Sequence, residues 1–373
     1  MRRASSPRIS VSLLTGFLGS GKTTILNSLM QRPELNRTLV IINEFGEIGV
    51  DHDLVAQSSD EVVVEMSSGC LCCTIRGDLA KTLREAPGRF ARGGERWFDR
   101  VIIETTGLAD PAPILHTLIN DPSVARQYRL DGVITVVDAV NGTNTLERQV
   151  ESVKQAAVAD RLLVTKTDIA EPAVVNELQS RLGALNPIAP QIIVQNGAVD
   201  PEVVLDAGEY DPSTKSTDAQ NWLKAEIFEA GGHGHEAGDH RHHGHDHHHD
   251  HDHDDVNRHD EHIQAFCLTL DEPIHSAAFE IWLEGLLLFR GEDFLRIKGI
   301  LNVVGTDGPT IIHGVQHVMH PPITLETWPS EDRRSRIVFI TRDIDEAVMR
   351  TSLEALNGAE RRQPGSLAAE RSR

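Results

Sequence analysis

Short runs of apolar residues recur along the first half of the chain with little polar alternation. They occupy residues 9–15, 38–42, 61–65, 100–104, 131–138, 161–165 and 190–194. Strands buried on both faces of a parallel sheet show this pattern, because neither face meets water. Segments of helical length lie between several of them, at residues 22–30, 146–159 and 172–185. The alternation predicts an α/β fold built on a doubly wound parallel sheet.

The pattern changes around residue 200, where polar sequence with glycine and proline begins. A tract at residues 233–262 then holds thirteen of the nineteen histidines and is too polar to bury a core. Apolar periodicity resumes with strands near 264–270, 294–304, 310–316 and 336–341 and a helix near 275–288. We therefore expect a first domain at 1–210, a linker with the tract at 211–262, a smaller α+β domain at 263–356 and a disordered tail at 357–373.

The charge balance limits the possible partners. Asp and Glu number 56 against 36 Lys and Arg, for a formal net charge of -20. Nucleic acids and anionic membranes repel an acidic body, so we expect neither as a partner. No apolar run is long enough to span a bilayer or to form a signal peptide. With only four cysteines in the chain, these features favour a soluble cytoplasmic protein whose thiols stay reduced.

Residues 16–24 read GFLGSGKTT and stand between a predicted strand and a predicted helix. This is the Gly-x4-Gly-Lys-Ser/Thr phosphate loop, in which glycines let backbone amides surround a phosphate at a helix N-terminus. Lys22 is expected to reach the outer phosphates and the Thr23 hydroxyl to ligate Mg²⁺. The motif identifies a P-loop NTPase, with predicted phosphate-loop contacts from Gly16, Gly19, Ser20, Gly21, Lys22, Thr23 and Thr24.

A second acidic ligand for Mg²⁺ is expected at the end of another strand. The segment VIIETTGLADP places Glu104 there, and Gly107 follows where a glycine can approach the γ-phosphate. Aspartate is the more common residue at this position. We predict that Lys22 and Glu104 are the catalytic residues and that Thr23 and Glu104 hold the magnesium ion.

The segment LLVTKTD, at residues 162–168, predicts the choice of base. In an Asn/Thr-Lys-x-Asp loop the aspartate carboxylate accepts two hydrogen bonds from the guanine edge. Adenine presents a different donor pattern and would leave the carboxylate unpaired. We therefore expect Asp168 to select GTP over ATP, with Lys166 lying along the purine.

Cys70, Cys72 and Cys73 fall within four positions, in SSGCLCC. Residues this close form a disulfide only with strain, and three thiols leave one unpaired. A metal site, a redox thiol and small buried residues remain as alternatives, and thiolates favour zinc. Three sulfurs leave a four-coordinate site incomplete, so Glu47, or else Glu44, is expected to complete it.

The histidine tract offers overlapping weak sites for zinc, nickel or cobalt, or else is a solvated linker of biased composition. Imidazoles with a pKa near ~6.5 are mostly neutral in the cytoplasm and can ligate metal. His313 and His317 are interpreted as ordinary domain histidines. The predicted weak ligands include His242, His243, His245, His247, His248, His249, His251 and His253.

The motifs GFLGSGKTT, NEFGEIGVD, GCLCC, ETTGLADP and TKTD occur in the order found in the CobW-like metallochaperone GTPases, which this chain resembles nearly throughout. The resemblance implies a GTPase that binds zinc at Cys-x-Cys-Cys and passes it to client apo-metalloproteins. Some members of this family instead serve cobalt enzymes. A metal buffer or sensor with a non-catalytic nucleotide site is the alternative, which the long histidine tract favours. An ATP-dependent ligase or kinase is disfavoured by TKTD.

Overall fold

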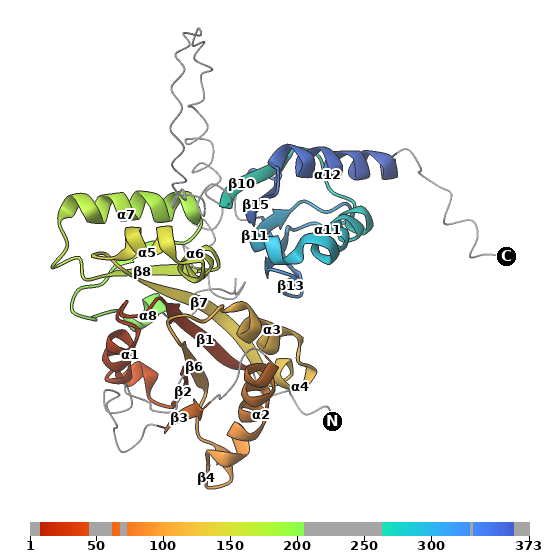
Figure 1. Cartoon of the computed structure of the whole chain (residues 1–373). Coiled ribbons are helices and arrows are strands. Elements are labelled where there is room, and N and C mark those ends of the chain that lie inside the picture. The colour runs from red at the N-terminus through yellow and green to blue at the C-terminus, as the bar shows by residue number, and fades with distance from the viewer. Residues whose placement is uncertain (1–7, 45–61, 68–72, 205–262, 329–330, 362–373) are drawn as a thin grey trace, which may run out of the picture.

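The structure, a computed structural model, describes residues 8–44, 62–67, 73–204, 263–328 and 331–361. Two units are visible in Figure 1, the first coloured red to green and the second cyan to blue. The first unit contains β1 (Ile9–Gly16), α1 (Lys22–Met30), η1 (Pro33–Leu35), β2 (Thr38–Glu44), β3 (Val62–Ser67), α2 (Cys73–Arg89), β4 (Ala91–Arg92), β5 (Glu95–Arg96), β6 (Arg100–Thr105), α3 (Ala112–Asn120), α4 (Pro122–Ala125), β7 (Tyr128–Asp138), α5 (Gly142–Arg148), α6 (Val150–Ala157), β8 (Arg161–Thr165), α7 (Pro172–Leu185), β9 (Gln191–Ile193) and α8 (Pro201–Val204).

The first unit is built on a seven-stranded parallel sheet with the order β3-β2-β6-β1-β7-β8-β9. This confirms the predicted doubly wound sheet, and each of the seven predicted strands is present. β1 lies between β6 and β7, and all eight of its residues are buried. The continuous apolar runs follow from this burial, because a strand covered on both faces has no side that favours polar residues.

Alternate residues of the central strands belong to two separate cores. Val11 and Leu13 pack with helices α2 and α3, whereas Leu14 packs with α1 on the opposite face. Leu26 and Leu83, from α1 and α2, are both fully buried. Because both faces of the sheet are covered, the carboxyl edge of the parallel strands is the part that stays open to a ligand.

The second unit contains β10 (Ile263–Leu270), α11 (Ser276–Arg290), η3 (Gly291–Asp293), β11 (Phe294–Leu301), β12 (Thr310–Val315), β13 (Val318–Met319), β14 (Ile323–Thr324), β15 (Ser335–Arg342) and α12 (Glu346–Arg361). Its antiparallel sheet has the order β10-β15-β11-β12-β13, with β14 paired to β12. Helices α11 and α12 supply Phe279, Trp282 and Leu353 to the core on one face. This is the smaller α+β domain that the sequence predicts.

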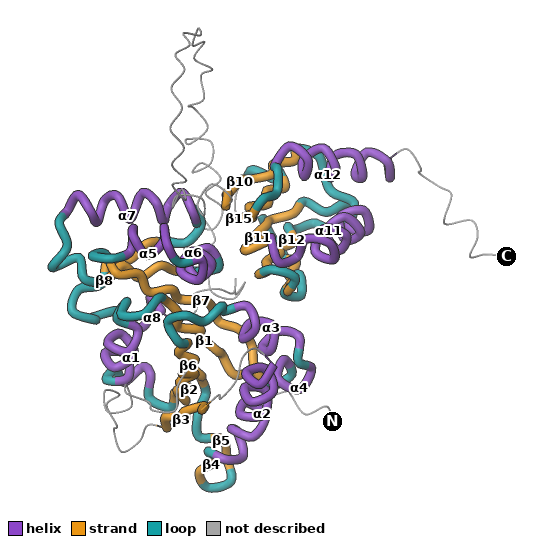
Figure 2. The backbone as a smooth tube through the Cα atoms, in the orientation of Figure 1, coloured by secondary structure: helices purple, strands orange, loops and turns teal. Residues whose placement is uncertain are grey.

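The two units are packed against each other (Figure 2). Helix α6 contacts β11, α3 contacts β13, and α7 contacts β10. Val315 of the second unit is part of the hydrophobic core formed by α2 and α3. The sheet of the second unit is therefore covered on one face by its own helices and faces the nucleotide-binding fold with the other.

Two helix predictions differ from the structure. The single helix expected at 146–159 is two helices, α5 and α6, because Gln149 adopts an extended conformation that ends one and begins the other. Helix α12 runs to Arg361, past the start of the expected tail at 357. Asn357 explains the extension, since its side chain accepts a hydrogen bond from the His275 amide at 3.1 Å and holds the helix against α11. No helix among the described residues is both long and apolar enough to cross a membrane.

Candidate functional site

The phosphate loop connects the buried strand β1 to helix α1. Gly16 and Gly21 have φ of 141° and 97°, a region that L side chains rarely adopt. A Cβ on Gly16 would also lie 2.3 Å from the Val136 carbonyl oxygen. Gly19 lies between them with a φ of 70°. The tight turn therefore depends on glycine, and it brings consecutive backbone amides to the N-terminus of α1, where anions bind.

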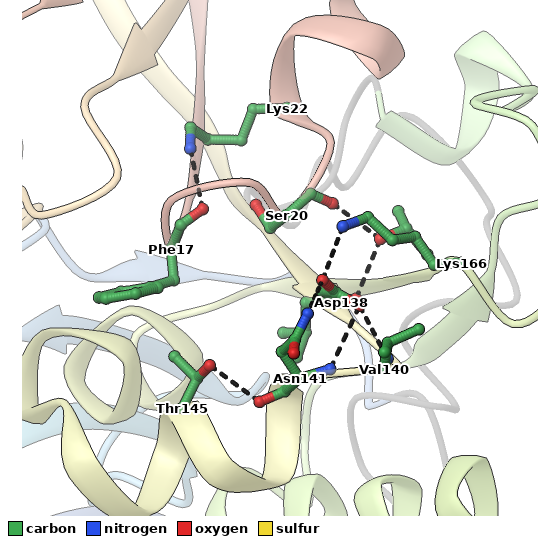
Figure 3. A network of polar contacts seen from close by, with 10 residues as sticks. Phe17, Ser20, Lys22, Asp138, Val140, Asn141, Thr145 and Lys166 are labelled. Atoms are coloured by element: carbon green, nitrogen blue, oxygen red, sulfur yellow. Dashed lines mark hydrogen bonds and ion pairs between the residues drawn. The ribbon is translucent and has the colours of Figure 1, made fainter. Parts of the chain in front are cut away.

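The Lys22 side chain folds back over this loop. Its Nζ donates to the carbonyl oxygens of Gly16 at 2.9 Å and Phe17 at 3.1 Å, and the second contact is drawn in Figure 3. Ser20 is buried and Thr24 is exposed. The lysine ammonium group is thus held at the loop where the outer phosphates of a nucleotide are expected.

Thr23 and Glu104 meet at the start of α1. The Thr23 hydroxyl donates to Glu104 Oε1 at 2.9 Å, and Glu104, at the end of β6, is only 5% exposed. β6 is the neighbour of β1 in the sheet, so their carboxyl ends reach the same place. A hydroxyl and a carboxylate are hard oxygen ligands of the kind Mg²⁺ prefers. The pair fits a magnesium ion bound beside the phosphate loop.

The segment after β6 lies directly on the phosphate loop. A Cβ on Gly107 would be 2.5 Å from the Leu18 backbone nitrogen, so only glycine allows this approach. Thr105 Oγ1 donates to Thr15 Oγ1 at 2.8 Å and joins the ends of the two strands. Residues 106–110, which we call the sensor loop, therefore contact the loop that would surround the β- and γ-phosphates.

The predicted base loop is joined to the phosphate loop at Thr165. Thr165 Oγ1 donates to the Ser20 carbonyl at 2.7 Å. The next residue, Lys166, has a positive φ of 58°, and its Nζ donates to Asp138 Oδ2 at 2.7 Å (Figure 3). Asp168 is exposed on the turn that follows. The structure thus places Lys166 next to the phosphate loop and leaves the Asp168 carboxylate accessible.

Asp138, at the end of β7, fixes the position of Lys166. Its carboxylate accepts hydrogen bonds from the Val140 amide at 2.7 Å and from Asn141 Nδ2 at 2.9 Å (Figure 3). Burial raises the pKa of Asp138, but the hydrogen bonds from Lys166 and Asn141 outweigh burial and hold the pKa below its usual value. The sequence interpretation missed this residue, although it carries the signal used for Glu104, an acid at the end of an apolar strand.

The predicted metal ligands fall mostly outside the described residues. Cys70, Cys72, Glu47 and the histidine tract lie there, and for Cys73, the first residue of α2, the structure describes the backbone alone. Within the described part of the chain no three His, Cys, Asp or Glu side chains are grouped so as to hold a metal. The cysteine site and the weak histidine sites remain predictions.

Two family models match the chain. Residues 10–193 match the CobW/HypB/UreG nucleotide-binding domain, and residues 263–357 match the cobalamin synthesis protein cobW C-terminal domain. Zinc chaperone YjiA of Escherichia coli is 30% identical over 348 residues, which cover 93% of this chain and 98% of the relative. Zinc chaperone CobW of a Sinorhizobium species is 28% identical, with 95% and 99% covered.

A solved structure resembles both units, and a further relative matches about half of the chain. The crystal structure of zinc-bound YjiA GTPase from E. coli has a TM-score of 0.66 to this chain at 27% identity, covering 94% of this chain and 99% of that one. Zinc-regulated GTPase metalloprotein activator 1 of Schizosaccharomyces pombe is 32% identical over 209 residues, which cover 54% of this chain and 50% of that relative.

Proposed function

The chain belongs to the CobW family of nucleotide-binding proteins, and from this membership and the site we propose that it is a GTP-hydrolysing zinc metallochaperone. In this proposal zinc bound at Cys70, Cys72 and Cys73 is passed to client apo-metalloproteins. Relatives along nearly its full length are named zinc chaperones. Zinc is the cargo, and GTP with Mg²⁺ supplies the change of state.

The observation that carries the proposal is the meeting of Lys22, Thr23 and Glu104 at the phosphate loop. An ammonium group and two oxygen ligands at one helix N-terminus are what a Mg²⁺-bound nucleotide triphosphate requires. The positioned charges would stabilise the γ-phosphoryl group as it leaves. In the base loop, Thr165 is bonded to the Ser20 carbonyl and Lys166 is held by Asp138. The exposed Asp168 is accessible to a guanine edge.

The strand register supports a shared zinc site near the nucleotide. β2 and β3 are parallel neighbours, and Glu44, the last residue of β2, pairs with Ser67, the last residue of β3. Glu47 and Cys70 each follow these ends by three residues, a span of at most ~10 Å of extended chain. The β2 residue Asn43 pairs with Thr105, which follows Glu104. Both candidate ligand segments therefore leave the sheet at the edge that carries the magnesium ligands.

The experiment is GTP turnover with and without zinc, on the full chain and on Lys22→Ala. We expect phosphate release that requires Mg²⁺, responds to zinc and disappears in Lys22→Ala. A chain that binds zinc and GTP without turnover would refute the enzyme and favour the metal buffer, which the thirteen-histidine tract at residues 233–262 also supports. Metal analysis of the protein from its native cytoplasm would separate zinc from cobalt or nickel.

A further inference from the structure

Helix α6 holds the sensor loop through a buried glutamine. Gln155, 1% exposed, donates from Nε2 to the carbonyl oxygens of Gly107 at 3.2 Å and Ala109 at 2.9 Å. One residue earlier, Lys154 Nζ pairs with Asp110 Oδ2 at 2.9 Å. Two adjacent residues of one helix therefore fix both halves of the loop that contacts the phosphate loop.

The sensor loop has no room to move without affecting this helix. Gly107 approaches the Leu18 backbone too closely for any side chain, so a shift of the phosphate loop toward Gly107 displaces the sensor loop. A buried amide whose partners move either loses its hydrogen bonds, which is unfavourable because the amide is then left unsatisfied, or moves with its partners. Movement of the helix is the less costly response.

The C-terminal end of α6 is attached to the second unit. Asn186, fully buried, donates from Nδ2 to the carbonyl oxygens of Ala156 at 2.9 Å and Ala157 at 3.1 Å, which fixes the helix end. The Ala157 side chain packs in a small core with Leu295 of β11 and Ile340 of β15. Any displacement of α6 is therefore felt by two strands of the C-terminal domain.

A buried charge cluster strengthens this attachment. Asp160, three residues after α6, forms ion pairs with Arg296 and with Lys298, the latter at 2.8 Å, and accepts a hydrogen bond from the Val133 amide at 2.9 Å. All three charged side chains are 7% exposed or less. Separating such a pair leaves an uncompensated buried charge, which is strongly unfavourable. The junction between Asp160 and β11 therefore acts as a rigid connection.

We propose that α6 couples the nucleotide to the C-terminal domain, with Gln155 as the positioning residue that transmits the state of the sensor loop. This inference rests on the proposed GTP-dependent function and adds a role for the C-terminal domain: it sets how strongly the γ-phosphate is held. By thermodynamic reciprocity, the nucleotide then changes the conformational equilibrium of the C-terminal domain by the same factor.

A double-mutant cycle tests the coupling with Gln155→Ala and Leu295→Ala in the full chain. The quantity measured is the ratio of the dissociation constants for GDP and for a non-hydrolysable GTP analogue. We expect Leu295→Ala to change this ratio about 5-fold or more. In the Gln155→Ala background the same substitution should change the ratio less than about twofold, because the buried contact of α6 with the sensor loop is already lost.

Two substitutions serve as matched controls. Leu268→Ala removes the same atoms as Leu295→Ala, but from the main hydrophobic core of the C-terminal domain, to which α6 contributes no residue. Ser152→Ala truncates another buried residue of α6 whose side chain is not among the described partners of the sensor loop. Both should leave the ratio unchanged, and Leu295→Val repeats the test if Leu295→Ala does not fold.

Two outcomes of the cycle itself would overturn the coupling: an unchanged ratio in a folded Leu295 variant, or the same effect of Leu295→Ala with and without Gln155. Because the readout is binding, a protein that discriminates the two nucleotides but does not hydrolyse GTP would refute the proposed enzymatic activity and leave this cycle valid. A wild-type chain that binds both nucleotides equally would refute the coupling.

Discussion

Acid should weaken the junction between the two units through His320. The ring of His320 lies 3.7 Å from that of His313, centroid to centroid, beside the cluster formed by Asp160, Arg296 and Lys298. Burial first, and then the positive charge of Arg296, lower the pKa of His320 to about 4. Lys298 and Arg8 act in the same direction, and the Asp160 carboxylate opposes them.

The sign and size follow from proton linkage. An unfolded histidine titrates near ~6.5, so between that pH and about 4 the unfolded chain binds a proton that the folded chain does not. Stability is therefore lost as pH falls through this window. The full loss is about 3 kcal/mol for His320, with roughly 2 kcal/mol of it between pH 7 and pH 5. His313, whose pKa burial also lowers, adds to the loss.

Urea unfolding at pH 7 and pH 5 measures this effect, with the free energy obtained by linear extrapolation. The wild-type chain should lose stability on acidification, and His320→Gln should lose roughly 2 kcal/mol less over the same interval. His317→Gln is the control, because His317 is exposed on the same hairpin. An identical pH dependence in His320→Gln and the wild type would refute the assignment of a buried neutral imidazole.

Three further predictions concern the nucleotide and the metal. Asp168→Asn should weaken GTP binding and favour xanthosine nucleotides in competition titrations, whereas equal binding of ATP and GTP by the wild type would contradict the base assignment. Glu104→Gln should lower GTP turnover at fixed Mg²⁺, because the contact with Thr23 survives but the negative charge is lost. A higher Mg²⁺ concentration should restore at least part of the turnover, and unchanged turnover would remove Glu104 from the magnesium site. Deleting residues 233–262 should abolish weak zinc binding and leave one tight zinc at the cysteines, whereas loss of the tight zinc would make the tract the principal site. In the intact chain the weakly bound zinc should be released first as the pH falls below ~6.5, because protonated imidazole cannot ligate metal.

The helices and strands that carry the site could be predicted from the sequence, because residues within or next to each element determine where it begins and ends. Helix α1 begins at Lys22, directly after a glycine, and helix α7 begins at Pro172, both as predicted. Apolar periodicity marks the length of each helix, and α7 ends at Leu185 as predicted. The place of Glu104 beside Thr23 followed from the rule that parallel strands share a carboxyl edge.

The contacts that link α6 to the sensor loop, and Asp160 to the second unit, could not be predicted from the sequence, because they depend on tertiary placement. Gln155 stands in an ordinary amphipathic helix, and nothing in its neighbours along the chain points to the carbonyls of Gly107 and Ala109. The two basic partners of Asp160, Arg296 and Lys298, lie more than a hundred residues away, across the histidine tract. The break at Gln149 was also missed, because no glycine or proline near this residue marks the extended conformation that separates α5 from α6.

The central claim is that nucleotide state controls how tightly zinc is held, and a zinc competition titration tests it most directly. The titration compares the chain loaded with GDP and with a non-hydrolysable GTP analogue, and repeats both on Glu47→Ala. We predict zinc affinities that differ about 5- to 150-fold between the two nucleotides in the wild type, with the difference lost in Glu47→Ala. A difference that survives in Glu47→Ala would move the switching ligand to Glu44. Equal zinc affinities with the two nucleotides would contradict the metallochaperone and leave a passive metal buffer.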